Sequence, residues 1–260
     1  QIPLKVQGIG LLNLELEINK ATEIRKIPYF IPLKVDWHNN KASYEDVTLE
    51  TTEINGGLKS IKIREKEILL WSQELIKGPY RIPITHGGIA LNLYADGEDQ
   101  ELHLQKWERI KDNTFQIVSG GIRIIRSWHI LEDQTIMETL SVKNLTNRLK
   151  QLNLEYAIFF SGKFNRVFSK DLSIGGEKVF SLGDNKIIGG VIDNKDVLFY
   201  MNVEEKRLSA YQLIGSNAVI RSNWKWILKP NEEKITKTIL SFNEENKKVL
   251  LANSILSMIR

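Results

Sequence analysis

Glycine and proline interrupt this sequence at short intervals, and short runs rich in Ile, Val, Thr and aromatic residues lie between them. Glycine pairs mark many of these breaks, at 56–57, 87–88, 120–121, 175–176 and 189–190. Short β-prone runs separated by turn residues are typical of all-β sandwiches and barrels. No regular alternation of strand and helix patterns is visible, so a doubly wound α/β sheet is not expected. The spacing therefore predicts an all-β fold.

Two segments alternate clearly between apolar and polar positions. In 235–242 the even-numbered residues share one face, and in 152–160 the even-numbered residues are all apolar. Successive side chains of a strand point to opposite sides, so the even-numbered face of 152–160 is predicted to meet the core. Its odd-numbered face carries Asn153 and Glu155 and is predicted to line a polar cleft.

Few helices are expected. Residues 243–260 are predicted to form a C-terminal helix, because Asn243 can cap it and acidic residues occupy its first turn. The segment 20–27 is a weaker helix candidate. No Ser/Gly linker, repeat or low-complexity tract occurs, so residues 1–260 are predicted to form a single domain, with 1–45 as an added layer.

Composition excludes several classes of protein. Hydrophobic residues make up 42% of the 260 residues, enough for a packed core, and the net charge of +4 is spread along the chain. Nucleic-acid binding is not expected, because no basic stripe is visible. Apolar runs fall far short of the roughly 20 residues that span a bilayer, so no membrane partner is expected.

The chain contains no cysteine, which excludes disulfides, thiolate metal sites and thiol nucleophiles. A lack of cysteine fits a reducing compartment, so a cytoplasmic location is expected. The sequence begins with Gln and not Met, so its start is expected to be trimmed, and a removed signal peptide stays open. The oligomeric state is left open.

Common catalytic and cofactor motifs are missing. The four histidines are not paired at metal-ligand spacing, and neither a nucleophile elbow nor a phosphate-binding glycine loop occurs. Neither a metal nor a cofactor is therefore predicted.

A series of short motifs follows in a fixed order along the chain. They are Gly56-Gly57, Leu69-Leu70-Trp71-Ser72, Gly87-Gly88-Ile89, His103-Leu104-Gln105-Lys106-Trp107, Leu140 to Asn147, Ala157-Ile158-Phe159-Phe160 and Leu228 to Glu233. Their order and spacing resemble the aldose 1-epimerase (galactose mutarotase) superfamily, most of all its glucose-6-phosphate 1-epimerase-type branch. The matches span roughly 50–242, and the resemblance implies a galactose mutarotase-like β-supersandwich.

The resemblance also implies a chemistry. In mutarotation a base takes the proton of the anomeric hydroxyl and an acid protonates the ring oxygen, so the sugar ring opens and recloses. Members of the superfamily use a Glu as base and a His as acid, with a second His that helps to hold the sugar. This chain departs from the pattern, because Ala157 stands where the superfamily has the His of a His-x-Tyr-Phe motif. Alanine cannot donate a proton.

Four residues are therefore the candidate acid and base groups. His103 occupies the place of the first motif His, and His86 lies in a glycine-rich turn beside the expected cleft. Glu204 is a strand-end Glu ahead of the Leu228 turn, and Glu155 shares its predicted face with Ala157. Turn capping for His86, a surface position for His103 and a solvated turn charge for Glu204 stay open as simpler interpretations.

Three residues are candidates for substrate binding. Arg81 lies near the place where the phosphate-type branch has an Arg, and a guanidinium can bind phosphate through two hydrogen bonds. Trp107 could stack on a sugar face, and Asn153 lies on the predicted polar face. A surface salt bridge for Arg81 and a core position for Trp107 are the alternatives.

Two functions from different classes follow from these observations. The first is a mutarotase-like protein that binds a small carbohydrate or sugar phosphate and interconverts its anomers with altered acid and base residues. The second is a non-catalytic sugar-binding or structural module, such as an accessory domain of a glycoside hydrolase. A degenerate fold that binds a partner is a third hypothesis.

Overall fold

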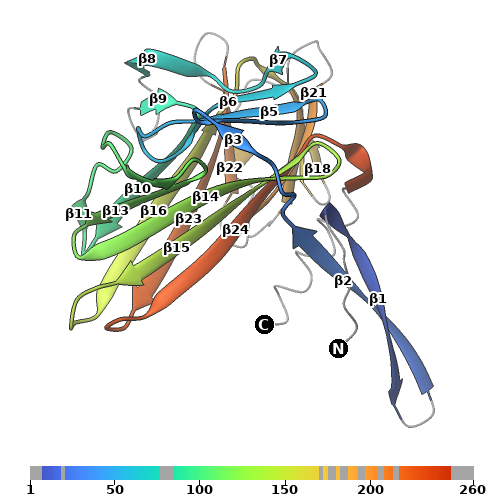
Figure 1. Cartoon of the computed structure of the whole chain (residues 1–260), viewed down its shortest axis with the longest axis horizontal. Coiled ribbons are helices and arrows are strands. Elements are labelled where there is room, and N and C mark those ends of the chain that lie inside the picture. Colours follow the sequence, from blue (N-terminus) through green and yellow to red (C-terminus); the bar gives the residue numbers. More distant parts are fainter. Residues whose placement is uncertain are drawn as a thin grey trace.

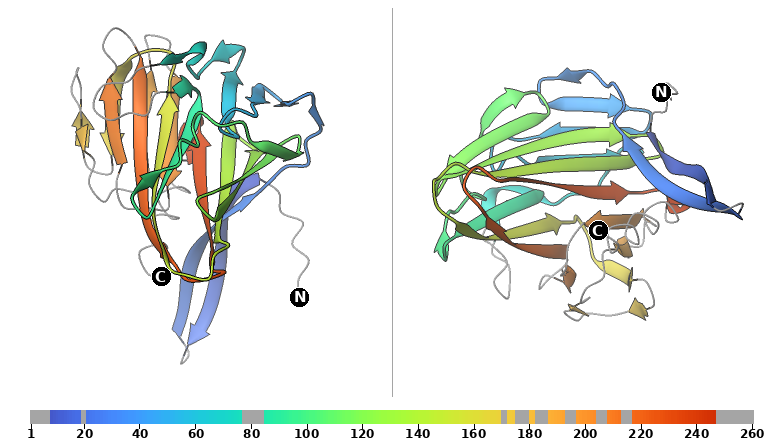
Figure 2. Two further views of the ribbon diagram at one scale, coloured as in Figure 1. Left: turned by 90° about the vertical axis from the view of Figure 1, so that its left-hand side faces the viewer. Right: turned by 90° about the horizontal axis from the view of Figure 1, so that it is seen from below.

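The computed structural model describes residues 8–18, 21–76, 85–169, 172–174, 180–181, 187–192, 197–203, 208–212 and 217–246. Nearly all the regular structure in these residues is β (Figure 1). Two large antiparallel sheets form the body, and smaller sheets lie around them (Figure 2). The prediction of an all-β, mutarotase-like sandwich is confirmed.

The larger of the two sheets has nine strands. In spatial order they are β12 (Glu108–Lys111), β13 (Thr114–Ser119), β14 (Ile122–Leu131), β15 (Thr135–Asn144), β24 (Glu233–Ser241), β21 (Val197–Val203), β20 (Ile187–Ile192), β17 (Phe164–Ser169) and β18 (Leu172–Ile174). The second sheet has six strands. These are β11 (Glu98–Asp99), β10 (Ile89–Ala95), β16 (Lys150–Phe159), β23 (Ala218–Leu228), β22 (Leu208–Gln212) and β19 (Phe180–Ser181).

Three smaller sheets complete the described chain. A five-stranded sheet consists of β3 (Trp37–His38), β4 (Lys41–Tyr44), β5 (Val47–Thr51), β6 (Leu58–Ile63) and β7 (Lys66–Glu67). Two hairpins are formed by β8 (Trp71–Ile76) with β9 (Thr85–Gly87), and by β1 (Gly8–Ile18) with β2 (Ala21–Ile31). The β1–β2 hairpin extends away from the rest of the described chain in both figures (Figures 1 and 2).

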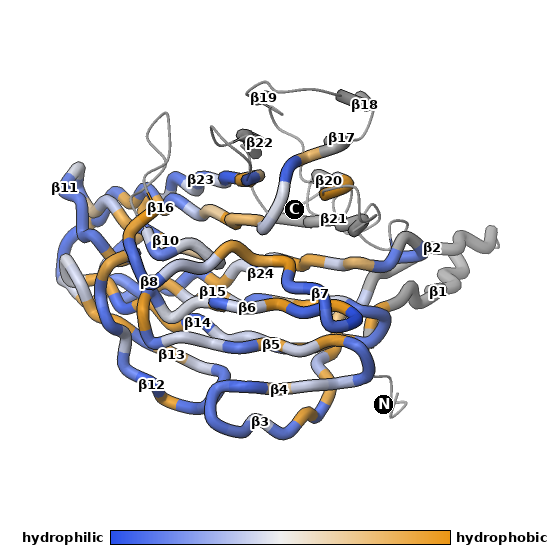
Figure 3. Tube along the Cα trace, turned by 90° about the horizontal axis from the view of Figure 1, so that it is seen from above, coloured by the Kyte–Doolittle hydropathy of each residue, from blue (hydrophilic) through white to orange (hydrophobic). Residues whose placement is uncertain are grey.

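Alternation along the strands places the core between the two large sheets. The even-numbered residues of β14 are buried, and so are those of β16 from Leu152 onward and those of β23. The even-numbered face predicted in 235–242 is buried as well, whereas Ile235 on its other side is 62% exposed. Figure 3 shows that β11 and β12, at the edges of the two sheets, are mostly hydrophilic. Both predicted strand faces are therefore confirmed.

Helix is almost absent from the described residues. The helix weakly expected over 20–27 is wrong, because β2 pairs with β1 along eleven residues, and this ladder satisfies the main-chain groups that a helix would otherwise pair. Asn243 accepts a hydrogen bond from the main-chain N–H of Glu245 at 3.0 Å, at the start of a 3₁₀ helix over Glu244–Asn246. The rest of the predicted C-terminal helix, 247–260, lies outside the described residues.

Within the described part of the chain, no helix has both the length and the apolar character needed to cross a membrane. The division into a single domain over 1–260 with an added layer over 1–45 stays a prediction.

Candidate functional site

The six-stranded sheet has one side turned away from the core, which we call the outer face. It is formed by the even-numbered residues of β10 and the odd-numbered residues of β16 and β23, because opposed residues of antiparallel strands share a side. Three rows cross it: Ala90, Ala157 and Arg221; Asn92, Glu155 and Asn223; and Tyr94, Asn153 and Lys225. Two of the rows consist entirely of side chains that are able to form hydrogen bonds.

The outer face changes character from one end to the other. At one end Ala90, Ala157, Phe159 and Val219 form a buried apolar cluster. The partly buried Leu70 and Ile76, from the region of β8, pack against this cluster. At the other end Ile227 is 61% exposed. The polar rows therefore lie between a covered apolar end and an open end.

An ion pair lies at the centre of the face. Arg221 donates from Nη2 to Oε1 of Glu155. The side chains of Glu155 and Arg221 are only 11% and 14% exposed. Asn92 and Asn223 are directly opposite Glu155 on its two neighbouring strands. The carboxylate is thus held in place by Arg221 and flanked by two amides.

Asn92 forms hydrogen bonds with the segment 99–102, which follows β10, and so holds it against the sheet. Its Nδ2 donates to Oδ1 of Asp99 at 2.9 Å, and its Oδ1 accepts from the main-chain N–H of Leu102 at 2.9 Å. Oδ1 of Asp99 also accepts from the N–H of Glu101 at 2.8 Å. Burial raises the pKa of the nearby Tyr94 phenol, and the negative charges of Glu155 and Asp99 raise it further. The charges of Glu155 and Asp99 therefore both act on Tyr94.

His103 follows directly in this loop. Its side chain is buried, and its Nδ1 has no hydrogen-bond partner among the described residues. Burial lowers the pKa of the imidazole, although the charges of Asp99 and Glu101 oppose that effect. His103 is therefore uncharged at neutral pH and retains a free ring nitrogen.

The open end of the outer face is hollowed into a cleft of about 550 Å³. Its lining residues are Tyr94, Gly97, Gln151, Leu152, Asn153, Lys225, Trp226 and Ile227. The Oδ1 atom of Asn153 is buried without a hydrogen-bond partner in the described part of the chain. A residue that lines the cleft therefore has an acceptor that the described part of the protein leaves unsatisfied.

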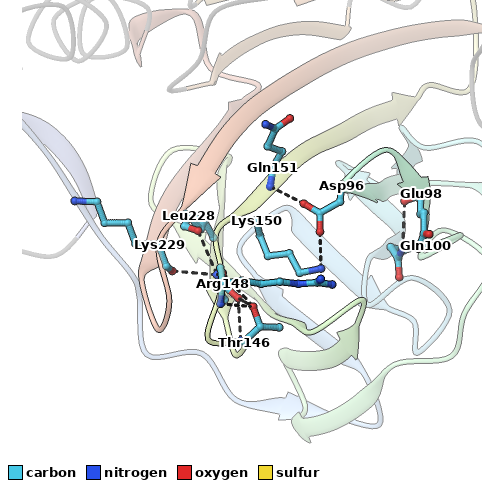
Figure 4. A network of polar contacts seen from close by, with 10 residues as sticks. Asp96, Glu98, Gln100, Thr146, Arg148, Lys150, Gln151, Leu228 and Lys229 are labelled. Atoms are coloured by element: carbon cyan, nitrogen blue, oxygen red, sulfur yellow. Dashed lines mark hydrogen bonds and ion pairs between the residues drawn. The ribbon is translucent and has the colours of Figure 1, made fainter.

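Asp96 precedes Gly97 and contacts Gln151, two residues that line the cleft, and Figure 4 shows its polar contacts. Its carboxylate accepts from Nζ of Lys150 at 2.7 Å and from the main-chain N–H of Gln151 at 3.0 Å. These hydrogen bonds, first that of Lys150, hold the pKa of Asp96 below its ordinary value, and the charge of Arg148 acts in the same direction. Asp96 is thus already engaged by the protein itself.

The seven candidate residues from the sequence fall into three groups: those at the outer face, those elsewhere in the structure, and those outside the described residues. In the first group, Glu155 and Asn153 lie on the outer face, and His103 lies in the loop that hydrogen bonds of Asn92 hold against it.

His86 belongs to the second group. It is half-buried on β9, where it stacks on Trp71 with ring centroids 5.7 Å apart. Its Nδ1 lies 3.1 Å from the carbonyl oxygen of Ser72.

Trp107 lies in the core. Its indole is 1% exposed, and its N–H donates to the carbonyl oxygen of Leu102 at 3.2 Å. The guanidinium of Arg126 lies 5.9 Å from its ring centroid. The structure therefore does not place Trp107 with Glu155. Arg81 and Glu204 lie outside the described residues.

The sequence did not single out six residues of the outer face and its loop: Asn92, Tyr94, Asp99, Arg221, Asn223 and Lys225. The alternation of β10 and β23 could have signalled five of them, but only their strand pairing brings them together with Glu155. No group of three or more potential metal ligands occurs among the residues that the structure describes.

Burial of histidine makes stability depend on pH. In the unfolded chain His103 takes up a proton near its ordinary pKa of 6.5, but in the folded chain it does so only at a lower pH. We expect the free energy of unfolding to fall as the pH drops below about 6.5. The full loss is about 1.4 kcal/mol for each tenfold difference between the proton affinities of His103 in the unfolded and the folded chain. Urea unfolding of the wild type and of His103→Gln at neutral and mildly acidic pH checks this.

The variant should lose part of the pH dependence. His129 remains as an internal comparison, because burial first and Lys237 second also lower its pKa. An unchanged pH profile in His103→Gln would contradict the assignment.

Comparison with known proteins finds similarity at the level of structure only. No protein-family model matches the sequence, and no curated protein matches it. A galactose mutarotase-like protein from Lactobacillus casei is similar with a TM-score of 0.58 and 7% identity, over 77% of this chain and 98% of that one. A galactose mutarotase related enzyme from Lactobacillus acidophilus is similar with a TM-score of 0.52 and 11% identity, over 77% of this chain and 96% of that one.

Part of a larger protein is also similar. A 4-alpha-glucanotransferase from Thermococcus litoralis gives a TM-score of 0.51 and 10% identity, over 89% of this chain but only 39% of that one. Identities of 7 to 11% carry information about the fold alone. The chain therefore has the galactose mutarotase-like β-supersandwich fold.

Proposed function

We propose that this protein binds a carbohydrate on the outer face of its six-stranded sheet. The observation that carries the proposal is the row of Asn92, Glu155 and Asn223 across three neighbouring strands, beside a cleft of about 550 Å³. Small-molecule sites are concave and combine apolar walls with a few fixed polar groups. Sugar hydroxyls both donate and accept, so amide and carboxylate side chains in a row suit them.

The ion pair with Arg221 prepares Glu155 for this role. A carboxylate in a fixed position can accept hydrogen bonds from two sugar hydroxyls, and such charge-assisted bonds are stronger than neutral ones. Less rotamer freedom is lost on binding when the side chain is already held. The similar structures named after galactose mutarotases support a carbohydrate ligand for this fold.

Mutarotation is the second candidate function. It is favoured by a carboxylate, Glu155, whose charge acts on Tyr94, and by an imidazole, His103, on which the charge of Asp99 acts. Glu155 would take the proton of the anomeric hydroxyl, and His103, after taking up a proton from solvent, would give it to the ring oxygen. Against it, Ala157 provides no acid, burial disfavours the protonated form of His103, and Arg221 already engages Glu155. The similarity to 39% of a larger glucanotransferase supports the non-catalytic alternative.

Replacing Glu155 by glutamine tests the binding site. We expect Glu155→Gln to weaken sugar binding by about tenfold or more, because hydrogen bonds to a charged group are worth about 1.5–3 kcal/mol. Calorimetric titration with glucose, galactose and glucose 6-phosphate measures the affinity, and thermal unfolding shows whether the variant remains folded.

Glu108→Gln is the matched control. This exposed residue lies on β12, in the other large sheet, and its removal should leave the affinity unchanged. Absence of binding to any sugar of a broad panel would overturn the proposed function. NMR of freshly dissolved anomers, which follows the rate of their equilibration, decides between the two candidate functions. A rate that the wild type accelerates and that Glu155→Gln and His103→Gln do not supports mutarotation. Equal equilibration rates with and without the protein exclude it.

A further inference from the structure

We propose that the cleft beside the outer face accepts the negative group of an acidic carbohydrate, and that Lys225 binds this group. This inference rests on the proposed function, because it assigns the class of sugar that the same face takes. Four observations carry it: the position of Lys225, the charges around it, the unpartnered amide of Asn153, and the apolar walls.

Lys225 lies next to the centre of the proposed site. It is directly opposite Asn153 on β16, and it is two residues along β23 from Asn223, which is opposite Glu155. Two residues of a strand span about 7 Å. The ammonium is therefore placed so that one ligand could contact both the Glu155 row and Lys225.

The charges around the cleft favour an anion. Among the described residues, Lys225 is the only charged side chain that lines the cleft, and it forms no ion pair with any of them. Of the carboxylates around the cleft, Glu155 is engaged by Arg221 and Asp96 by Lys150. Asp99, opposite Tyr94, accepts hydrogen bonds from the amide of Asn92 and the main-chain N–H of Glu101. Lys225 is thus the positive group in the cleft that is left for a ligand.

Asn153 supplies the neighbouring contact. Its Oδ1 is buried without a described hydrogen-bond partner, and an unsatisfied buried acceptor costs stability until something donates to it. A ligand hydroxyl adjacent to the negative group would satisfy this atom. Tyr94 and Ile227 give the cleft apolar walls against which the ring can pack. The ligand chemistry is therefore a hydroxylated ring with one carboxylate or phosphate.

Calorimetric titration with matched neutral and acidic sugars tests the proposal. The pairs are glucose against glucuronate, galactose against galacturonate, and glucose against glucose 6-phosphate. We expect the acidic member of at least one pair to bind about tenfold more tightly to the wild type, as a charge-assisted hydrogen bond predicts. The uronates and the phosphate distinguish the two sources of negative charge. Added salt should reduce the preference.

Lys225→Met should abolish the preference, measured as the ratio of the affinities for the acidic and the neutral sugar of each pair. Lys229→Met is the matched control, because Lys229 is an exposed lysine just after the same strand that does not line the cleft. Equal binding of neutral and acidic sugars by the wild type, or a preference that persists in Lys225→Met, would overturn this inference and leave the proposed function standing. Failure of every sugar to bind would instead overturn the proposed function.

Discussion

Replacing Arg126 by methionine is expected to lower the free energy of unfolding by about 3–5 kcal/mol, because the change leaves a carboxylate buried without its partner. Arg126 is fully buried, Glu138 is 2% exposed, and Nε of the arginine lies 2.6 Å from Oε1 of the glutamate. Methionine fills a similar volume but carries no charge. Equilibrium unfolding in urea, followed by circular dichroism, measures the effect.

The position of Arg126 explains why the loss should be large. Arg126 lies on β14 and Glu138 on β15, both in the nine-stranded sheet. Nη1 of Arg126 also donates to the carbonyl oxygen of Asn55 at 2.7 Å, just before β6. At 3.4 Å it reaches the carbonyl of Ile89, where β10 of the six-stranded sheet begins. One guanidinium therefore connects three sheets.

An exposed pair provides the control. Arg64 and Asp46 are 3.1 Å apart, but the side chain of Arg64 is 75% exposed. Arg64→Met should cost less than about 1 kcal/mol, as exposed ion pairs do. Adding Glu138→Leu to Arg126→Met should recover part of the lost stability, since the unpaired buried charge is then removed. A loss in Arg126→Met no larger than that in Arg64→Met would contradict this account.

The sequence predicted the fold well where one strand alone carries the signal. Alternation in 152–160 correctly identified which side chains meet the core, and alternation in 235–242 correctly identified which residues share one face, because side-chain direction is a property of the strand itself. The segment 20–27 was misjudged. Ile24 and Ile27 are three residues apart, which fits one face of a helix, but the partner strand that decides the outcome is not visible in a local window.

The candidate site was predictable only in part, for the same reason. Glu155 could be found because it alternates with apolar residues of its own strand. Arg221 could not, because it lies 66 residues away and meets Glu155 only through the pairing of β16 with β23. Trp107 shows a different limit: a tryptophan beside a motif histidine is equally compatible with stacking on a sugar and with packing in the core. The structure buries Trp107, which favours packing in the core.

Replacing Gly88 by alanine is expected to destabilise the protein by about 2–5 kcal/mol, from left-handed backbone strain and a steric clash together. Gly88 has a φ of 64°, and an added Cβ would lie 2.2 Å from the carbonyl oxygen of Leu58. The main chain cannot easily move away. Its N–H donates to the carbonyl of Leu70 at 2.6 Å, and its carbonyl accepts from the N–H of Phe159 at 2.9 Å.

Gly97 separates the two causes. It has a φ of 88°, also left-handed, but no described atom lies within 4 Å of an added Cβ. Gly97→Ala should therefore show the strain alone, about 1–2 kcal/mol. The difference in urea unfolding between the two variants measures the clash at the point where β6, β8 and β16 meet the start of β10. If both variants lost the same stability, the close approach of Gly88 to Leu58 would not constrain the fold, and glycine would be required there for its φ angle alone.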